Sequence, residues 1–106
     1  MFLISSPTSS QNFTTALQLA QGLRHQDHQV ALVLLQDAVL AAVRGHREAE
    51  NLLKQTLRDG VRFFVLEEDL RLRGFHPPQL LPFIHSISYP GLVALMEDSH
   101  WTRGVF

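Results

Sequence analysis

Two clusters of polar side chains follow apolar stretches of this sequence. Gln36 and Asp37 come after the run VALVLL, and Glu67, Glu68 and Asp69 come after the run VRFFVL. Carboxylates in such places could act as a general acid and base, or could bind Mg²⁺ through their oxygens. The competing interpretation is structural, because a carboxylate at the start of a helix meets free N–H groups and the positive end of the dipole. The spacing matches no specific metal-binding loop, so the pattern assigns no catalytic residue.

A second candidate site is the serine-rich segment SSPTSS, which carries hydroxyls on Ser5, Ser6, Thr8, Ser9 and Ser10. The segment follows a short apolar run and opens a helical pattern, so its backbone N–H groups could form an anion-binding loop. It contains no glycine and matches neither GxxxxGK[ST] nor GxGxxG, which argues against a nucleotide or flavin site. The simpler interpretation is a loop in which Ser9 or Ser10 caps the next helix.

The chain has no cysteine, which excludes disulfides, thiolate metal ligands and cysteine nucleophiles. Its six histidines are scattered and show no HExxH or other paired ligand spacing. A zinc site without cysteine would need three histidines or carboxylates from separate elements to converge. No GxSxG nucleophile motif occurs either. We therefore expect no catalytic residue, no bound metal and no cofactor.

Periodic apolar residues predict the elements that position these side chains. One helical face carries Phe13, Ala16, Leu17, Ala20 and Leu23, and Gly60 stands where a helix C-terminal glycine is expected. Glu50 and Lys54 are four residues apart in the favourable order on a second helix. The expected strands are 2–4, 30–35, 61–66 and 83–87, with an edge strand in the tail, and the expected helices are 13–25, 46–59 and 89–97, with a short apolar helix or turn over 38–45.

Alternating strands and helices predict an α/β protein with βαβ units and a mainly parallel sheet. The continuous apolar run over 30–35 is typical of a strand that helices cover on both faces. We expect a three-layer sandwich with four or five strands in a single domain spanning 1–106. Ligands bind such sheets at the carboxyl ends of the strands. Both polar clusters should therefore share one edge, here called the strand-end edge: Gln36, Asp37, Glu67, Glu68 and Asp69.

Composition restricts the function classes. The chain has 106 residues, of which 45% are hydrophobic, and a net charge of −1. This balance is typical of a globular protein and argues against a broad electrostatic surface for nucleic acid. The N-terminal sequence has no positive n-region, and no apolar run approaches the roughly 20 residues of a membrane span. We expect a cytoplasmic protein without a membrane partner.

Apolar residues are frequent toward the C-terminal end, and most are expected to lie in the core: Phe83, Ile87, Tyr89, Leu92, Val93, Trp101, Val105 and Phe106. Aromatic side chains also anchor protein interfaces. Oligomerisation would add buried apolar surface to so short a chain. Tyr89, His100, Trp101 and Phe106 are therefore candidate interface residues of a homo- or hetero-oligomer.

Three segments in order, LLQDAVLAAVRG, VRFFVLEEDLRLRGF and SISYPGLVALMEDSHWTRGVF, resemble the DsrE/DsrF/DsrH superfamily and, within it, the DsrH/TusB branch. The likeness lies in a strand ending in LLQD, in an EDL-x-x-RG segment after a strand, and in an I-x-Y-x-x-LV-x-L helix before a histidine and a tryptophan. It covers about residues 30–103. Ala38 departs from the branch, where glycine is common, and so does the serine-rich N-terminal segment.

The resemblance implies a flavodoxin-like, DsrE-like fold and a part in sulfur traffic. Related complexes of three paralogous subunits pass persulfide sulfur on a cysteine of one subunit, toward 2-thiolation of the tRNA wobble uridine or within dissimilatory sulfur oxidation. The matching place here, near Leu66, has no cysteine. The resemblance therefore implies a non-catalytic subunit with cysteine-bearing DsrE/DsrF-like (TusD/TusC-like) partners and an indirect link to tRNA.

An alternative function stays open because a fold does not fix a function. The chain would then be an independent, homo-oligomeric small-molecule-binding protein or a cysteine-free enzyme on the same fold. It would use the strand-end edge, with the Ser5–Ser10 loop binding an anion and His100 as a polar group. A ligand that binds only the folded chain would raise its thermal stability.

Overall fold

The computed structural model describes residues 2–6, 10–26, 28–43, 47–75, 80–97 and 104–105, with backbone alone for 47–49 and 104–105. Strands and helices alternate along the chain, as the sequence predicts. In order, they are β1 (Phe2–Ile4), α1 (Gln11–His25), β2 (Ala31–Leu34), the 3-10 helix η1 (Gln36–Ala42), α2 (Arg47–Arg58), β3 (Arg62–Leu66), α3 (Glu67–Leu72), β4 (His85–Ile87), α4 (Tyr89–Met96) and β5 (Gly104–Val105).

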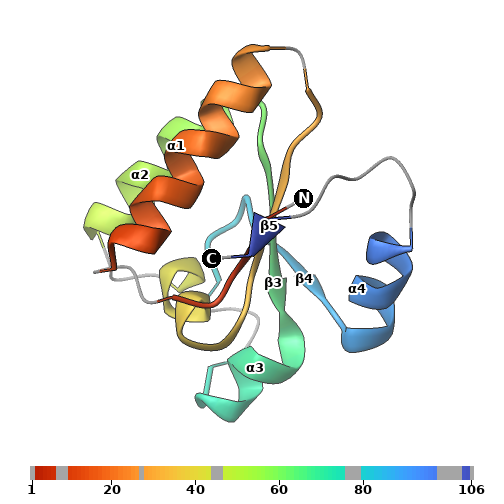
Figure 1. Ribbon diagram of the computed structural model, residues 1–106. Helices are drawn as coiled ribbons and strands as arrows, with labels where there is room; N and C mark the ends of the chain where they lie inside the picture. Colours follow the sequence, from red (N-terminus) through yellow and green to blue (C-terminus); the bar gives the residue numbers. More distant parts are fainter. Residues whose placement is uncertain are drawn as a thin grey trace.

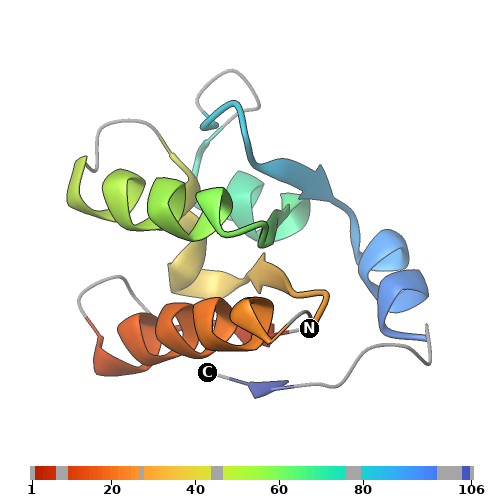
Figure 2. The ribbon, with the colours of Figure 1, turned by 90° about the horizontal axis from the view of Figure 1, so that it is seen from above.

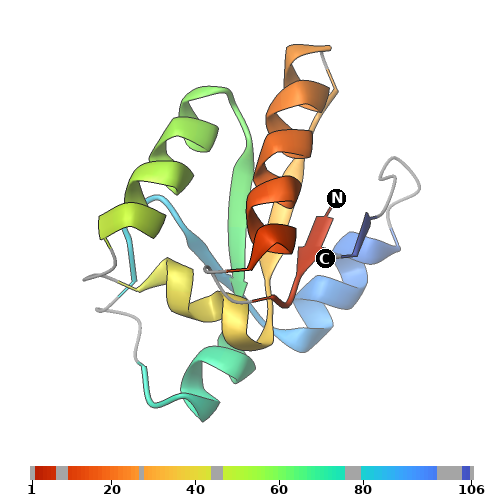
Figure 3. The same cartoon turned by 60° about the vertical axis from the view of Figure 1, so that its left-hand side comes forward.

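The five strands form one parallel sheet in the order β4-β3-β2-β1-β5. Strands β1 to β4 follow one another outward, and β5 returns to pair with the free side of β1 (Figure 3). All strands therefore end at the same edge, where η1 and α3 lie at the bottom of Figure 1. The predicted α/β sandwich with a mainly parallel sheet of four or five strands is confirmed.

The sheet has a thick layer on one face and a thin layer on the other. Helices α1 and α2 lie side by side over one face, and α4 alone lies on the other (Figures 1 and 2). The main core fills the α1/α2 face and includes Phe13, Leu53 and Phe63, each at most 1% exposed. The α4 face has a smaller cluster, in which only Val33, Leu66 and Leu92 are buried. Burial is thus strongly unequal between the two faces.

Local signals set several element ends as predicted. The Ser10 hydroxyl accepts a hydrogen bond from the Asn12 N–H at 3.1 Å and caps α1. Gly60 follows α2 with a φ of +95°, a conformation that glycine adopts without strain. Lys54 and Glu50 form the expected pair at 3.2 Å on α2. The predicted strand over 83–87 was too long, because Ile84 lies before β4 begins at His85.

The prediction that most C-terminal apolar residues lie in the core is confirmed for three of the five described residues, because Phe83, Ile87 and Leu92 belong to or pack against the two core clusters. Leu92 is buried, and Phe83 and Ile87 are half-buried, but Tyr89 and Val93 are each 51% exposed. The physical reason is that α4 contacts the sheet along one side only, through the cluster around Leu92. Among the described residues, no helix is long and apolar enough to cross a membrane.

Candidate functional site

The strand-end edge forms as predicted, because β2 and β3 are parallel neighbours. Leu34 pairs with Val65 in their shared register, so η1 and α3 begin side by side. Gln36 and Asp37 open η1, while Glu67, Glu68 and Asp69 fill the first turn of α3. Acidic side chains in a first turn interact favourably with the helix dipole. The side chains of Asp69 and Glu68, however, accept hydrogen bonds from other elements rather than from the start of α3.

Asp69 is the buried polar group of this edge, at 7% exposure. Its Oδ2 accepts a hydrogen bond from the backbone N–H of Gln36 at 2.8 Å. Gln36 has a φ of +49°, the left-handed conformation that a side chain with a Cβ rarely adopts. A charge-assisted hydrogen bond of this length is among the stronger ones in proteins. Asp69 therefore holds the chain in a strained turn where β2 ends.

The backbone at Gln36 predicts a specific response to substitution. Gln36→Gly is expected to keep the free energy of unfolding within about 0.5 kcal/mol of wild type, because glycine adopts a positive φ without a Cβ clash. Gln36→Val should lower it by about 1–2 kcal/mol, because a β-branched residue is strained there. Urea denaturation of both variants is the measurement. Equal stability of the two variants would contradict the strained turn.

A second contact joins η1 to α3 on the solvent side of the edge. The Arg73 Nη2 lies 3.2 Å from the Asp37 Oδ1, and the Arg73 Nη1 donates to the Asp69 carbonyl oxygen at 3.2 Å. The Asp37 side chain is 64% exposed, so the ion pair stabilises the fold only weakly. Arg73 nevertheless connects the two polar clusters through both of its terminal nitrogens.

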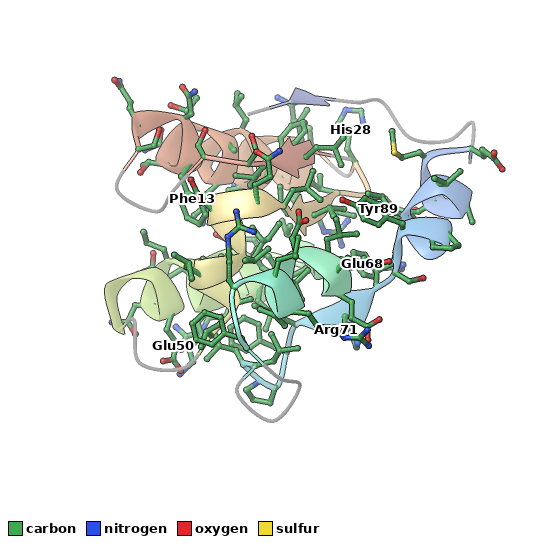
Figure 4. All side chains as sticks on the ribbon, turned by 90° about the horizontal axis from the view of Figure 1, so that it is seen from below. Phe13, His28, Glu50, Glu68, Arg71 and Tyr89 are labelled. Atoms are coloured by element: carbon green, nitrogen blue, oxygen red, sulfur yellow. The ribbon has the colours of Figure 1, made fainter. Side chains whose placement is uncertain are left out.

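Glu68 ties α3 to the start of α4. Both of its carboxylate oxygens accept from the Tyr89 N–H, at 3.0 and 3.2 Å. Figure 4 shows Glu68 and Tyr89 between the two helices. The Ser88 hydroxyl accepts from the Gly91 N–H at 3.3 Å, which also caps α4. Glu67 forms an ion pair with Arg71 one turn along α3. Glu68 thus helps to position α4.

The chemistry available at this edge follows from these partners. Each of its four carboxylates accepts from an N–H group or an arginine. In the part of the chain that the structure describes, no group of three histidines or acids could hold a metal ion. The arrangement suits a rigid, polar surface. Sequence reasoning missed Arg71 and Arg73, although the RLRG that closes the second cluster was the available signal.

The serine-rich loop leaves the carboxyl end of β1, one strand from Gln36. Because β5 returns to the free side of β1, the chain reverses its winding direction between these two strands, where parallel sheets often bind ligands. Ser5 and Ser6 are half-buried, and Ser10 caps α1. Thr8 and Ser9 lie outside the described residues. An anion at this loop stays a prediction.

Of the candidate interface residues, the structure places only Tyr89, which is exposed at the start of α4. His100, Trp101 and Phe106 lie outside the described residues. Tyr89 lies beside Glu68 (Figure 4), so the candidate interface adjoins the strand-end edge. Sequence spacing did not indicate this proximity, because β4 separates α3 from α4 along the chain.

A small pocket of about 120 Å³ lies at the opposite end of the sheet, between the ends of α1 and α2. Its lining includes Arg24, Gly60 and Arg62. The Arg24 Nε donates to the Asp59 carbonyl oxygen at 3.1 Å, so this guanidinium braces the end of α2. Two helix C-termini meet here, and their negative dipole ends favour arginine without any ligand. The helix ends thus account for the arginines that line this pocket.

The family model described as DsrH like protein matches residues 5–101. The chain belongs to the DsrH-like family. The match includes the serine-rich segment, the strand-end edge and α4, so the DsrH-like chain is covered almost throughout. No curated protein matches it.

Solved structures give the same fold for the DsrH-like chain. The ychN protein from E. coli superposes with a TM-score of 0.84 at 20% sequence identity, covering 99% of this chain and 97% of that one. The protein of unknown function MTH1491 from Methanobacterium thermoautotrophicum superposes with a TM-score of 0.73, also at 20% identity, covering 99% and 96%. At such identity the likeness establishes the fold alone. Membership of the family relates the chain to sulfur-relay proteins.

Proposed function

We propose that this DsrH-like chain is a non-catalytic subunit of a sulfur-relay complex and assembles with cysteine-bearing DsrE/DsrF-like partners. The single observation that carries the proposal is the absence of cysteine from a member of this family. A persulfide is held on a cysteine sulfur and passes when another thiolate attacks the outer sulfur and the first thiolate leaves. A chain without thiols can take neither role, so the carrier must be another subunit.

The strand-end edge supports a framing role over a catalytic one. Asp69 and Glu68 accept from backbone N–H groups, and Asp37 and Glu67 face arginines. A general acid or base needs a carboxylate within reach of the substrate proton. Carboxylates that already hold η1 and α4 in place are better suited to fix the shape of a surface. We assign the strand-end edge to the side that faces the partner subunit.

We further propose the pathway and the compartment in which this chain acts. The relayed sulfur would serve 2-thiolation of the tRNA wobble uridine or sulfur oxidation, so the chain's link to tRNA is indirect. The complex would act in the cytoplasm, where free thiols stay reduced. Deleting the gene and quantifying 2-thiouridine in host tRNA separates the two pathways. A loss of the modified nucleoside indicates thiolation, and an unchanged level with impaired sulfur oxidation indicates the other pathway.

Reconstitution tests which subunit carries the sulfur and whether this chain accelerates its transfer. Purified chain, partner subunits and a persulfide donor are mixed, and persulfides are located by thiol-selective labelling and mass spectrometry. We expect labelled sulfur on a partner cysteine and none on this chain, with transfer at least tenfold slower when this chain is left out. A relay that runs equally fast without it would contradict the proposal.

The first control experiment tests whether the chain binds partner proteins in its native host. The tagged chain is purified from its native host and the bound proteins are identified. Recovery of cysteine-bearing DsrE/DsrF-like proteins is the expected result. If the chain is instead recovered alone, and a small ligand raises its thermal stability, the independent ligand-binding function replaces the relay.

A further inference from the structure

The helix α4 has an unusual composition for its position. Its eight residues, YPGLVALM, include no charged side chain. A helix that is apolar on all sides is normally buried on all sides. In α4 only Leu92 is buried, while Tyr89 and Val93 are 51% exposed and Pro90 and Ala94 are exposed as well. The outer side of α4 is therefore an apolar surface with no cover among the described residues.

A further exposed apolar side chain lies on α3, the helix that Glu68 joins to the start of α4. Leu72 is the most exposed large apolar residue described, at 81%. It lies four residues after Glu68, so both side chains occupy one face of α3. The Glu68 carboxylate accepts from the Tyr89 N–H, so that face is directed at the start of α4. Together the exposed residues form the α3/α4 patch: Leu72, Tyr89, Pro90, Val93 and Ala94.

We propose that the α3/α4 patch is the docking surface for a cysteine-bearing subunit, an inference that rests on the proposed function. The patch has no charge, so an apolar partner surface can cover it without leaving a charge buried and unpaired. Polar side chains border it on α3, where the Arg71 side chain is 67% exposed beside Glu67. An apolar centre with a polar rim is the usual composition of a protein interface.

The area argues against an interface made by two α4 helices alone. An eight-residue helix is about 12 Å long and about 10 Å wide, so its outer half offers about 200 Å². Two copies joined α4 to α4 would bury about 400 Å², well below the roughly 1,200 Å² of a specific interface. A partner that covers both α4 and the polar face of α3 contacts more surface. It would also lie against the strand-end edge.

A charge placed in the patch tests the inference in the full chain. Val93→Glu puts a carboxylate in the exposed centre of the patch. Leu19→Glu is the matched control, because Leu19 is 47% exposed on α1, across the sheet from α4. Each variant is co-expressed with the host's DsrE-like and DsrF-like proteins, and the recovered partner is quantified. We expect Val93→Glu to reduce recovery at least tenfold and Leu19→Glu to change it less than twofold.

A second variant, on α3, tests whether the effect of Val93→Glu comes from a local folding defect in α4. Leu72→Glu is expected to reduce partner recovery as Val93→Glu does, while both variants keep the wild-type melting temperature within a few degrees. If all variants recover the partner at wild-type levels, the docking surface is wrong and the proposed function stands. If wild type recovers no cysteine-bearing partner, the proposed function fails as well. If Val93→Glu instead converts a homo-oligomer into a monomer, as measured by light scattering, the occupant is a second copy of this chain.

Discussion

Replacing Asp69 with alanine is expected to lower the free energy of unfolding by about 2 kcal/mol, because the substitution removes a buried, ionised acceptor. The carboxylate is 7% exposed and accepts from the Gln36 N–H at 2.8 Å. Without it, the strained turn at Gln36 loses the contact that holds it, and its φ of +49° is less well determined. The effect should appear as a lower urea midpoint with an unchanged slope.

Two variants separate this contact from nearby charges. Asp69→Asn keeps one acceptor oxygen in the same place, so we expect a loss of about 1 kcal/mol. Asp37→Asn alters an ion pair whose carboxylate is 64% exposed, and we expect a change below about 0.5 kcal/mol. If Asp69→Ala proves as mild as Asp37→Asn, the buried hydrogen bond does not support the edge.

A larger loss is expected from Phe63→Ala, about 3–5 kcal/mol, because a fully buried aromatic ring is removed from the core. Phe63 is 1% exposed on β3 and faces the α1/α2 side of the sheet. Its ring contacts Phe83 edge to face, with centroids 6.3 Å apart. A domain of this size is stable by only about 5–15 kcal/mol, so the variant should be close to unfolding at 37 °C.

Phe64, which follows Phe63 on β3, is the control for the difference in burial between the two faces of the sheet. Phe64 is half-buried on the α4 face, where its ring lies 6.1 Å from that of His85. We expect Phe64→Ala to lower the free energy of unfolding by about 1–2 kcal/mol, because less of the ring leaves a dry environment. Thermal or urea unfolding of the isolated chain compares the two. Equal losses would contradict the difference between the layers.

The sequence predicted the sheet well because its strands are marked locally. VALVLL and VRFFVL are continuous apolar runs, and both became central parallel strands at residues 31–34 and 62–66. Helix ends were equally readable where Ser10 caps α1 and Gly60 follows α2. Such signals act within a few residues, so they can be read without knowing the tertiary structure.

The sequence predicted which residues form the candidate site, but not which hydrogen bonds those residues make. Parallel pairing of β2 and β3 brought the two polar clusters together as expected. The clusters cap other elements, however: Asp69 holds the start of η1, and Glu68 holds the start of α4. These bonds depend on the positions of whole helices, which no local pattern encodes. Likewise, the apolar composition of α4 could not show that Tyr89 and Val93 are exposed rather than buried in the core.

The strand order has a consequence for how the chain is made. Strands β1 to β4 leave the ribosome in the order in which they lie in the sheet, so each can add to a neighbour already synthesised. Strand β5 is the exception, because it pairs with β1 across nearly the whole chain. The side of β1 that receives β5 therefore stays an open edge until residues 104–105 have emerged. During that interval the nascent sheet offers unpaired backbone groups to any other extended segment, so co-translational chaperone contact should concentrate on β1.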